Sequence, residues 1–377
     1  MKDIVIVGGG PAGAYLGYCL AKNGIRAVIF DHSHPREKPC GGGIPAVALK
    51  RFPILNETPG PRGADSRLMV IAPNNRHAVL EDGMPYQINV SRLRLDKFLL
   101  DLAVEQGAKH IEEKVTGIEY IDSVWHVKTG ERVVETGLIA GADGVNSIVR
   151  RYVAGPHRKD DLALCYGLFA RGIEDTIPVL KYIKGMKGYI WTFPRGDHTS
   201  IGIGGEFNNA RLLKQELNKF IAENYPRLEI LSRWGALAPS ARGPETFSAP
   251  CAGEGWLLVG DAAGHVDPVS GEGIRYALWS AELAAGCIAG GNHLYYDKLW
   301  RKRYGHYLLN SARLKKYPYY ELPLNITVGL ARRSKTFSKS ALRASYHGLT
   351  KKQLALLAAK GMPGVIYEVM LSLRPRL

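Results

Sequence analysis

Three glycines near the N-terminus stand at a spacing that suits a dinucleotide. Gly8, Gly10 and Gly13 follow the apolar run 4–7 in the order Gly-x-Gly-x-x-Gly. The first glycine allows a tight turn, the second lets a pyrophosphate approach the backbone, and the third lets a helix pack closely on the preceding strand. Asp31 ends the next apolar run, where a carboxylate can accept hydrogen bonds from both hydroxyls of an adenosine ribose. This acid favours a ribose without a phosphate.

The elements that must position these residues form a strand–helix–strand unit. Pro11 suits a first helical turn, Ala12 begins an apolar stripe, and Gly24 ends the helix. Residues 27–30 are apolar and mostly β-branched or aromatic, which is typical of a buried parallel strand. Strand, turn, helix, strand and acid together predict a dinucleotide site. The alternative is an ordinary strand–helix–strand unit with a glycine-rich turn, and this stretch alone does not distinguish FAD from NAD.

Other residue types that could do chemistry lie further along the chain. Cys40 stands in a loop rich in proline and glycine, where it could shape the reactive space or help to deliver a proton; the alternative is a buried, inert thiol. Tyr189, Trp191 and Phe193 alternate and should share one face of a strand, either as a ligand surface or as ordinary core. His265, in another glycine-rich loop, suits a proton path or a structural hydrogen bond.

Composition places the chain among globular proteins of one large or two medium domains, with 377 residues and 46% hydrophobic residues. The sequence has no apolar run of 18 residues and no signal peptide before the first strand, so we expect no transmembrane helix and a cytoplasmic protein. Its five cysteines are scattered, which indicates a reducing compartment, and show no zinc spacing. We therefore expect no metal site.

The net charge of +15 is carried by the last 80 residues, which hold 17 Lys and Arg against two acids, Glu321 and Glu368. Several bulky apolar residues lie among these bases, a pattern that suits a helix at a membrane interface. A solvated basic face is the alternative. Nucleic acid is disfavoured, because no motif for its binding accompanies the charge. The interleaved apolar residues are Leu330, Phe337, Leu342, Tyr346, Leu349, Leu354, Leu356 and Leu357.

Three segments together resemble a known group of flavoproteins. They are GGGPAG at 8–13, GADG at 141–144 and GDAAGHVDPVSGEGIRYAL at 260–278. The trio is similar to FAD-dependent oxidoreductases with the para-hydroxybenzoate hydroxylase type of fold. The resemblance implies that Asp261 binds the ribityl chain, that the loop and helix start at 268–274 face the isoalloxazine, and that Arg92 lies beside the pyrophosphate. For Arg92, a surface arginine at a helix start is the alternative.

A narrower resemblance rests on KPCGGGIP at 38–45 and GYIWTFP at 188–194. These two segments look like signatures of the geranylgeranyl reductase family, which saturates isolated double bonds of isoprenoid chains. The resemblance covers about residues 1–300. It implies that the Cys-Gly-Gly loop lies near the flavin and that the aromatic strand lines a lipid cavity. The implied residues are, for FAD, Gly8, Gly10, Pro11, Ala12, Gly13, Asp31, Cys40, Gly41, Arg92, Asp143, Asp261, Gly271, Gly273 and Ile274; for substrate, Tyr189, Trp191 and Phe193; for catalysis, Cys40 and His265.

The expected fold class is α/β: a Rossmann-like FAD-binding domain split in sequence by an antiparallel substrate domain, with a basic helical C-terminal region. We expect the FAD-binding domain at 1–45, 91–155 and 246–297, the substrate domain at 46–90 and 156–245, and the helical region at 298–377. Several apolar residues at 210–231 recur at helical spacing, and 256–260 reads as one more buried strand.

The resemblance implies hydride transfer from reduced flavin and protonation of an isoprenoid chain on a lipid, pigment, quinone or diphosphate. Alternatives are a flavin monooxygenase or halogenase, a carotenoid cyclase-like enzyme without net redox change, and a flavin-binding protein without turnover. The sequence has no second Gly-x-Gly-x-x-Gly after a strand, so electrons must come from transiently docked NADPH, a reduced ferredoxin or a reduced quinone. We expect the protein to be peripheral at the membrane.

Overall fold

The computed structural model describes residues 3–173, 177–315, 321–346 and 361–369. Contacts divide the chain into two compact units of three stretches each. The first unit comprises Met1–Lys38, Arg92–Ala163 and Leu237–Lys315, and the second comprises Pro39–Ser91, Leu164–Ala236 and Lys316–Leu377. The boundary expected at residue 45 therefore falls at 38, and the stretch expected to form one C-terminal region is divided at 315.

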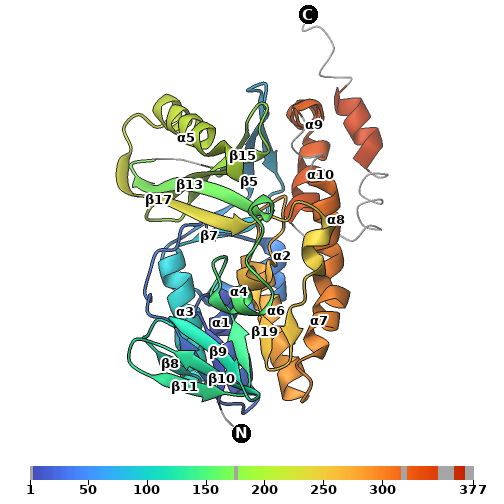
Figure 1. Ribbon diagram of the computed structural model, residues 1–377. Helices are drawn as coiled ribbons and strands as arrows, with labels where there is room; N and C mark the ends of the chain where they lie inside the picture. The colour runs from blue at the N-terminus through green and yellow to red at the C-terminus, as the bar shows by residue number, and fades with distance from the viewer. Residues whose placement is uncertain (1–2, 174–176, 316–320, 347–360, 370–377) are drawn as a thin grey trace, which may run out of the picture. The chain divides into compact units, whose positions relative to one another are not determined.

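The first unit is built on a six-stranded sheet in the order β18-β19-β12-β1-β2-β8 (Figure 1). All neighbouring pairs are parallel except β18 with β19. Its central strands are fully buried, which explains why they read as continuous apolar runs. A separate antiparallel sheet in the order β11-β10-β9 belongs to the same unit. The strands are β1 (Ile4–Val7), β2 (Ala27–Phe30), β8 (Lys109–Ile111), β9 (Gly117–Ile121), β10 (Val124–Lys128), β11 (Val133–Thr136), β12 (Ile139–Gly141), β18 (Ala252–Gly253) and β19 (Trp256–Leu258).

Helices of the first unit pack around this sheet, and α1 contacts both α3 and α6. Gly17 of α1 allows the close approach to β2, because a Cβ there would lie 2.6 Å from the Ile29 side chain. The helices are α1 (Pro11–Lys22), α3 (Arg92–Glu105), α4 (Ile148–Val153), α6 (Ile274–Ala289), α7 (Tyr295–Trp300) and α8 (His306–Leu314); a π-helical turn spans Arg301–Gly305, and 3-10 turns span Lys159–Asp161, Pro244–Ser248 and Gly260–Ala263.

The second unit is built on a seven-stranded sheet in the order β17-β13-β16-β15-β14-β5-β6. The sheet is mixed, because β14 pairs in parallel with β5 while the β14–β15, β15–β16 and β5–β6 pairs are antiparallel. A small antiparallel sheet, β3-β7-β4, completes the unit. The strands are β3 (Gly43–Pro45), β4 (Arg62–Asp65), β5 (Arg67–Ile71), β6 (His77–Glu81), β7 (Gln87–Val90), β13 (Leu162–Arg171), β14 (Val179–Tyr182), β15 (Gly188–Pro194), β16 (Thr199–Glu206) and β17 (Glu229–Pro239).

Both faces of the seven-stranded sheet are covered. On one face, Ile190, Ile201 and Ile203 pack against Leu217 and Phe220 of α5. On the other face, Trp191 and Leu180 share a core with Val328 of α9 and Leu342 of α10. Both α9 and α10 contact β6, and Figure 1 shows them on the side of the sheet where β5 lies. The helices of this unit are α2 (Ala46–Arg51), α5 (Ala210–Asn224), α9 (Glu321–Arg333) and α10 (Lys335–Tyr346), with 3-10 turns at Pro53–Glu57 and Phe207–Asn209.

The C-terminal helices are attached by their apolar residues, which corrects part of the expected membrane-facing pattern. Leu342 is fully buried, Phe337 packs on the same core, and the Tyr346 ring lies 4.7 Å from that of Tyr86. Arg343 donates to the buried Asp82 carboxylate at 2.8 and 2.9 Å. These side chains were expected to face a membrane, but they pack on the seven-stranded sheet and bury its Trp191 face. Leu349, Leu354, Leu356 and Leu357 lie outside the described residues.

Candidate active site

The turn between β1 and α1 has the shape that the glycine spacing predicts. A Cβ on Gly8 would lie 2.5 Å from the Ala142 carbonyl oxygen, and one on Gly13 would lie 1.9 Å from the Gly8 carbonyl oxygen. Both positions therefore require glycine for the fold itself. Beside Gly10, in contrast, the nearest atom is Nη2 of Arg36 at 3.8 Å. The backbone at Gly10 thus presents an open cradle that a side chain would fill.

The first turn of α1 faces the same cradle. Gly10 is the N-cap of α1 and offers no side-chain acceptor, and Pro11 is the first helical residue. Backbone N–H groups at a helix start attract anions, because they lack intrahelical partners and carry the positive end of the helix dipole. Gly10, Pro11, Ala12 and Gly13 therefore fit the pyrophosphate of a dinucleotide.

Asp31 lies at the end of β2 and is held ionised beside the glycine turn. Its carboxylate accepts from the Gly9 N–H at 2.7 Å and from the Ser33 N–H at 2.8 Å. Burial opposes ionisation, but the hydrogen bonds from Ser33 and Gly9 outweigh it and lower the pKa of Asp31. An ionised acceptor at this position is what ribose binding requires, and that role stays a prediction.

Arg92 opens α3 and is buried, with an exposed fraction of 4%, so the surface alternative is wrong. Its guanidinium forms a two-point ion pair with Asp96, at 2.6 and 2.8 Å. The Arg92 N–H donates to Glu37 at 2.9 Å. Neither Asp96 nor Glu37 was singled out from the sequence, because Glu37 lies 55 residues away and carries no local capping signal. The predicted position of Arg92 beside the pyrophosphate remains a prediction.

Asp143, in the GADG segment, has one oxygen in use and one without a partner. Its Oδ2 accepts from the Ile148 N–H at 2.7 Å at the start of α4. Its Oδ1 is buried and has no hydrogen-bond partner among the described residues. Burial raises the pKa of this carboxyl, although hydrogen bonds from the Ser147 side chain and the Ile148 backbone oppose the shift. An orphaned buried acceptor fits a donor group of a bound ligand.

The third segment forms a 3-10 turn, a loop and the start of α6. Asp261 lies in the turn, with the Lys38 ammonium 3.7 Å from its Oδ2, a partner that sequence reasoning missed. Gly271 has a φ of 72°, in the region that favours glycine. Gly273 is the N-cap of α6 and Ile274 its first residue, again without a side-chain cap. This helix start can stabilise negative charge on a flavin ring.

Glu272, in the same loop, is a titratable group that the motifs alone do not assign to a role. It pairs with Arg275 at 2.8 Å, and its Oε1 is buried without a partner among the described residues. Burial raises the pKa of Glu272 to about 7, against the opposing charge of Arg275. A carboxyl that titrates near neutrality can hold or release a proton.

His265 lies in a sealed cluster of the first unit. Its Nδ1 is hydrogen-bonded to the Tyr304 hydroxyl at 2.9 Å, and its Nε2 lies 3.6 Å from the Cys251 thiol. The Trp300 ring packs on it at 4.3 Å between centroids. Burial lowers the pKa of His265 to about 3, so the ring is neutral at physiological pH. These contacts favour the structural hydrogen bond over the expected catalytic role.

In the second unit, the three aromatic residues of β15 lie on one face, as their alternation predicts. Tyr189, Trp191 and Phe193 pack on one core cluster, whereas Ile190 faces the other. The ring contacts run along β15 and beyond it: Tyr189 and Trp191 lie 6.1 Å apart, and Trp191 stacks on Trp234 of β17 at 6.0 Å with planes inclined by 25°. The second unit therefore carries an extended aromatic surface, defined here as Tyr182, Tyr189, Trp191, Phe193 and Trp234.

The Cys-Gly-Gly loop rests directly on this aromatic surface. A Cβ on Gly41 would lie 2.9 Å from the Phe193 ring, so only glycine lets the loop approach so closely. The Gly42 N–H donates to the Cys40 thiol at 3.3 Å, and the Cys40 carbonyl accepts from Ser200 at 2.9 Å. Cys40 and Gly41, assigned to the cofactor from the resemblance, thus belong to the second unit and join the aromatic residues.

Arg195 holds this arrangement in place and was missed by sequence reasoning. Its side chain is fully buried and donates from Nη2 to the Cys40 carbonyl and from Nε to the Gly41 carbonyl. Its guanidinium also lies 4.8 Å from the Phe169 ring centroid. Arg195 directly follows the aromatic segment, so its place in the sequence could have pointed to it.

Comparisons with known proteins decide the family. A family described as FAD binding domain matches residues 1–164. A digeranylgeranylglycerophospholipid reductase of Methanococcus vannielii is 28% identical over 83% of this chain and 85% of that protein. A geranylgeranyl diphosphate reductase of Rhodobacter capsulatus is 30% identical over 77% of this chain and 76% of that protein. The chain belongs to the geranylgeranyl reductase family.

Solved structures agree with this family fold. A geranylgeranyl bacteriochlorophyll reductase-like protein of Thermoplasma acidophilum has a TM-score of 0.77 at 21% identity, over 98% of both chains. The flavin-dependent brominase Bmp2 has a TM-score of 0.69 at 17% identity, over 93% of this chain and 100% of that one. These likenesses show the fold. As a geranylgeranyl reductase family member with an FAD-binding domain, the protein is an FAD-dependent oxidoreductase.

Proposed function

We propose that this protein is an FAD-dependent reductase that saturates isolated carbon–carbon double bonds of an isoprenoid chain on a lipid, pigment or diphosphate. The observation that carries the proposal is the Cys40–Gly41 loop seated on the aromatic surface by Arg195. Relatives named as reductases of geranylgeranyl diphosphate and of a digeranylgeranyl lipid support the substrate class.

The main contribution of the second unit to the proposed reaction is to position the substrate. Reduced FAD supplies a hydride when bound, and the other alkene carbon takes up a proton. An isolated double bond has no carbonyl that a side chain could polarise, so alignment and exclusion of water must provide much of the acceleration. Tyr189, Trp191 and Phe193 offer an apolar wall for such a chain, and the loop that carries Cys40 packs against it through Gly41. We infer that this wall orients the chain.

In the first unit, the residues for the dinucleotide fit FAD. Gly10 leaves an open cradle, the helix starts of α1 and α6 lack side-chain caps, and Asp143 Oδ1 is an orphaned acceptor. We infer that Gly8–Gly13 and Arg92 hold the pyrophosphate, that Asp31 holds the ribose, and that Asp261 holds the ribityl chain. Gly271, Gly273 and Ile274 would present backbone N–H groups to the ring.

The test is a single-turnover reaction under anaerobic conditions. The flavin of the purified protein is reduced chemically and mixed with geranylgeranyl diphosphate or a digeranylgeranyl lipid, and the products are weighed by mass spectrometry. Each saturated bond should add two hydrogen atoms. Products of unchanged mass would indicate a cyclase-like reaction, added oxygen or halogen in air would indicate a monooxygenase or halogenase, and no change with any prenyl compound would contradict the proposal.

The electron donor is a further part of the proposal. We infer an external donor, either NADPH, a reduced ferredoxin or a reduced quinone, because the sequence carries one dinucleotide fingerprint. Mixing the oxidised protein with each donor in a stopped-flow apparatus, and following loss of flavin absorbance near 450 nm, identifies it. Reduction by ferredoxin should slow as salt rises, because it would depend on the basic C-terminal residues.

We also infer that the protein docks on a membrane surface. No helix in the described ranges is both long and apolar enough to span a bilayer. Leu322 and Ile326 lie one turn apart on α9 and are exposed to 69% and 53%, and the exposed bases Arg332 and Arg333 end the same helix. Exposed apolar residues close to bases suit an anionic interface. The segment 361–369 adds Met362, Ile366 and Tyr367, all half-exposed or more.

Vesicle flotation tests this docking. The variant L322D/I326D should lose binding to vesicles that contain anionic lipid, while FAD content stays unchanged. L212D/L231D is the matched control, because it adds the same charges at exposed apolar positions of the same unit. Equal flotation of the two variants would contradict docking through α9.

A further inference from the structure

Helix α5 covers the face of the seven-stranded sheet opposite to the aromatic surface. Leu213, Leu217 and Phe220 face the sheet and are buried with Ile190 and Ile203. Trp191, on the same strand as Ile190, faces the other way. A site beside α5 therefore lies on the other face of the sheet from Tyr189, Trp191 and Phe193, and of the aromatic surface it includes Trp234.

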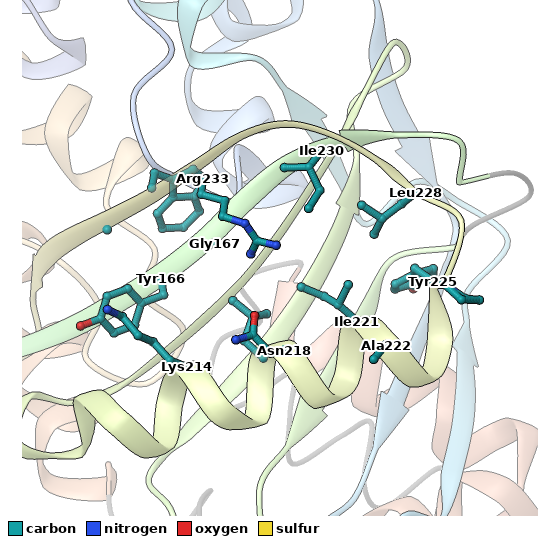
Figure 2. A pocket seen from close by; sticks show the side chains of 14 residues that line it. Tyr166, Gly167, Lys214, Asn218, Ile221, Ala222, Tyr225, Leu228, Ile230 and Arg233 are labelled. Atoms are coloured by element: carbon teal, nitrogen blue, oxygen red, sulfur yellow. The ribbon is translucent and has the colours of Figure 1, made fainter.

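A cavity of about 860 Å³ lies between α5 and the strands β13 and β17 of that sheet. Volumes of roughly 300–1,000 Å³ are typical of small-molecule sites. Figure 2 shows one wall formed by α5, with Lys214, Asn218 and Ile221, and the other formed by β13 and β17, with Tyr166 and Ile230. The fourteen lining residues include no acid, but they include two bases, Lys214 and Arg233.

The cavity is polar at one end and apolar at the other. The chain runs along α5, turns after Tyr225 and returns through Leu228 into β17. This return places Leu228 and Ile230 toward the C-terminal half of α5 and Arg233 toward its N-terminal half, where Lys214 lies (Figure 2). The Lys214 ammonium stands 4.7 Å from the Tyr166 ring centroid and is thereby held at the polar end.

The cavity as a whole, polar end included, is long enough for a head group and a chain rather than a small ring. From Lys214 to Tyr225 the helix advances about 17 Å at 1.5 Å per residue. Ile221, Ala222 and Tyr225 line the C-terminal part of this stretch, with Leu228 and Ile230 opposite. Burial against these apolar walls stabilises a hydrocarbon chain, whereas the two bases, Lys214 and Arg233, favour a negative head group.

We propose that this cavity binds an amphiphile with one hydrocarbon chain and a phosphate head. The phosphate lies between Lys214 and Arg233, with the Asn218 amide as a third donor. The chain runs past Ile221 toward Leu228 and Tyr225. This site shares Trp234 with the aromatic surface, but its proposed head-group and chain contacts are made by other residues and do not depend on the reaction proposed there.

The experiment uses the FAD-loaded protein and decyl phosphate below its micelle concentration, measured by isothermal titration calorimetry. K214A/R233A should weaken one binding event at least tenfold. K219A/R227A is the matched control, because it removes two bases from the same helix and connecting segment that do not line the cavity. The control should bind as the unmodified protein does. Equal losses in both variants would overturn the proposal, because they would indicate general charge attraction.

Filling the apolar end provides the second variant. I221W should abolish that binding event and leave the melting temperature within a few degrees, because Ile221 is only partly buried. Unchanged affinity in I221W would place the ligand elsewhere and overturn the proposal.

Two ligand controls separate the chemistry of head and chain. Inorganic phosphate should bind at least a hundredfold more weakly than decyl phosphate, and neutral decyl glucoside at least tenfold more weakly. Inorganic phosphate binding as tightly as decyl phosphate would make this a site for free phosphate. Decyl glucoside binding equally well would make it a plain apolar groove. Either result would overturn the proposal.

Discussion

The cofactor cradle of the first unit is made of backbone, whereas the aromatic surface of the second unit is made of side chains. In the cradle, positions 8 and 13 require glycine, because a Cβ at Gly8 or Gly13 would clash with a carbonyl oxygen. In the second unit, Trp191 and Phe193 matter for what their rings cover, and Gly41 is needed to let a loop reach them. A backbone site tolerates almost no substitution, while a side-chain site can be tuned to another ligand.

A substitution at Gly10 tests this contrast most directly, and we expect it to have the largest effect, on FAD binding. G10V should fold but lose FAD completely, because the space beside Gly10 is open to a side chain and is the space that a pyrophosphate needs. G13A, a smaller change, should instead unfold or lose most of its stability, since its Cβ would lie 1.9 Å from the Gly8 carbonyl oxygen. Absorbance near 450 nm and circular dichroism separate the two outcomes. A G10V protein that stays yellow would contradict the cradle.

The contrast also explains what the sequence could predict. Gly8, Gly13, Pro11 and Asp31 obey short-range rules, so their spacing alone predicted strand, helix and turn, and the structure agrees. The common face of Tyr189, Trp191 and Phe193 followed from strand alternation in the same way.

Contacts between distant segments could not be predicted, because no local rule relates their positions. Glu37 reaches the start of α3 across 55 residues, Arg195 reaches Cys40 across 155, and Arg343 reaches Asp82 across 261. For the same reason the apolar residues of α10 were expected at a membrane. Their spacing indicates an amphipathic helix but does not say what covers its apolar face.

The second-largest effect is expected on the aromatic surface. W191L should keep FAD but lower kcat/KM for a prenyl substrate at least tenfold, because the ring that stacks on Trp234 would no longer orient the chain. Ile190→Val is the matched control on the opposite face of the same strand. It should cost about 0.5–1.5 kcal/mol of stability without changing kcat/KM. If W191L lost its flavin, the cofactor and substrate functions could not be assigned to separate units.

Cys40 tests whether the loop contributes chemistry or only shape. C40A should retain FAD and the fold, because the Cys40 contacts to Arg195 and Ser200 are made by its carbonyl. We expect a several-fold slower reduction or a product with fewer saturated bonds, read by mass spectrometry. C19A is the control thiol, since Cys19 lies on α1 of the first unit and burial raises its pKa to about 12. Unchanged rate and products in C40A would reduce Cys40 to scaffold.

The smallest effect concerns His265, which tests whether a polar group of the first unit is structural. Its pKa is lowered from 6.5 to about 3 by burial, so between these values the unfolded chain binds a proton that the folded protein does not. The contribution of His265 to the free energy of unfolding is therefore fully present above pH 6.5. It falls by up to about 1.4 kcal/mol per pH unit as the pH drops toward 3.

Replacing His265 should destabilise the protein at neutral pH and stabilise it at low pH. H265Q should be about 1–2 kcal/mol less stable than the unmodified protein at pH 7.5, because it loses part of the hydrogen bonding to Tyr304 and the packing on Trp300. Glutamine does not titrate, so the gap should close near pH 5.5 and then invert, as urea unfolding at several pH values would show. His157, whose pKa is lowered to about 4, remains in both proteins and cancels. A gap that stays constant down to pH 4.5 would mean that His265 is charged when folded, and a proton-carrying role would then regain support.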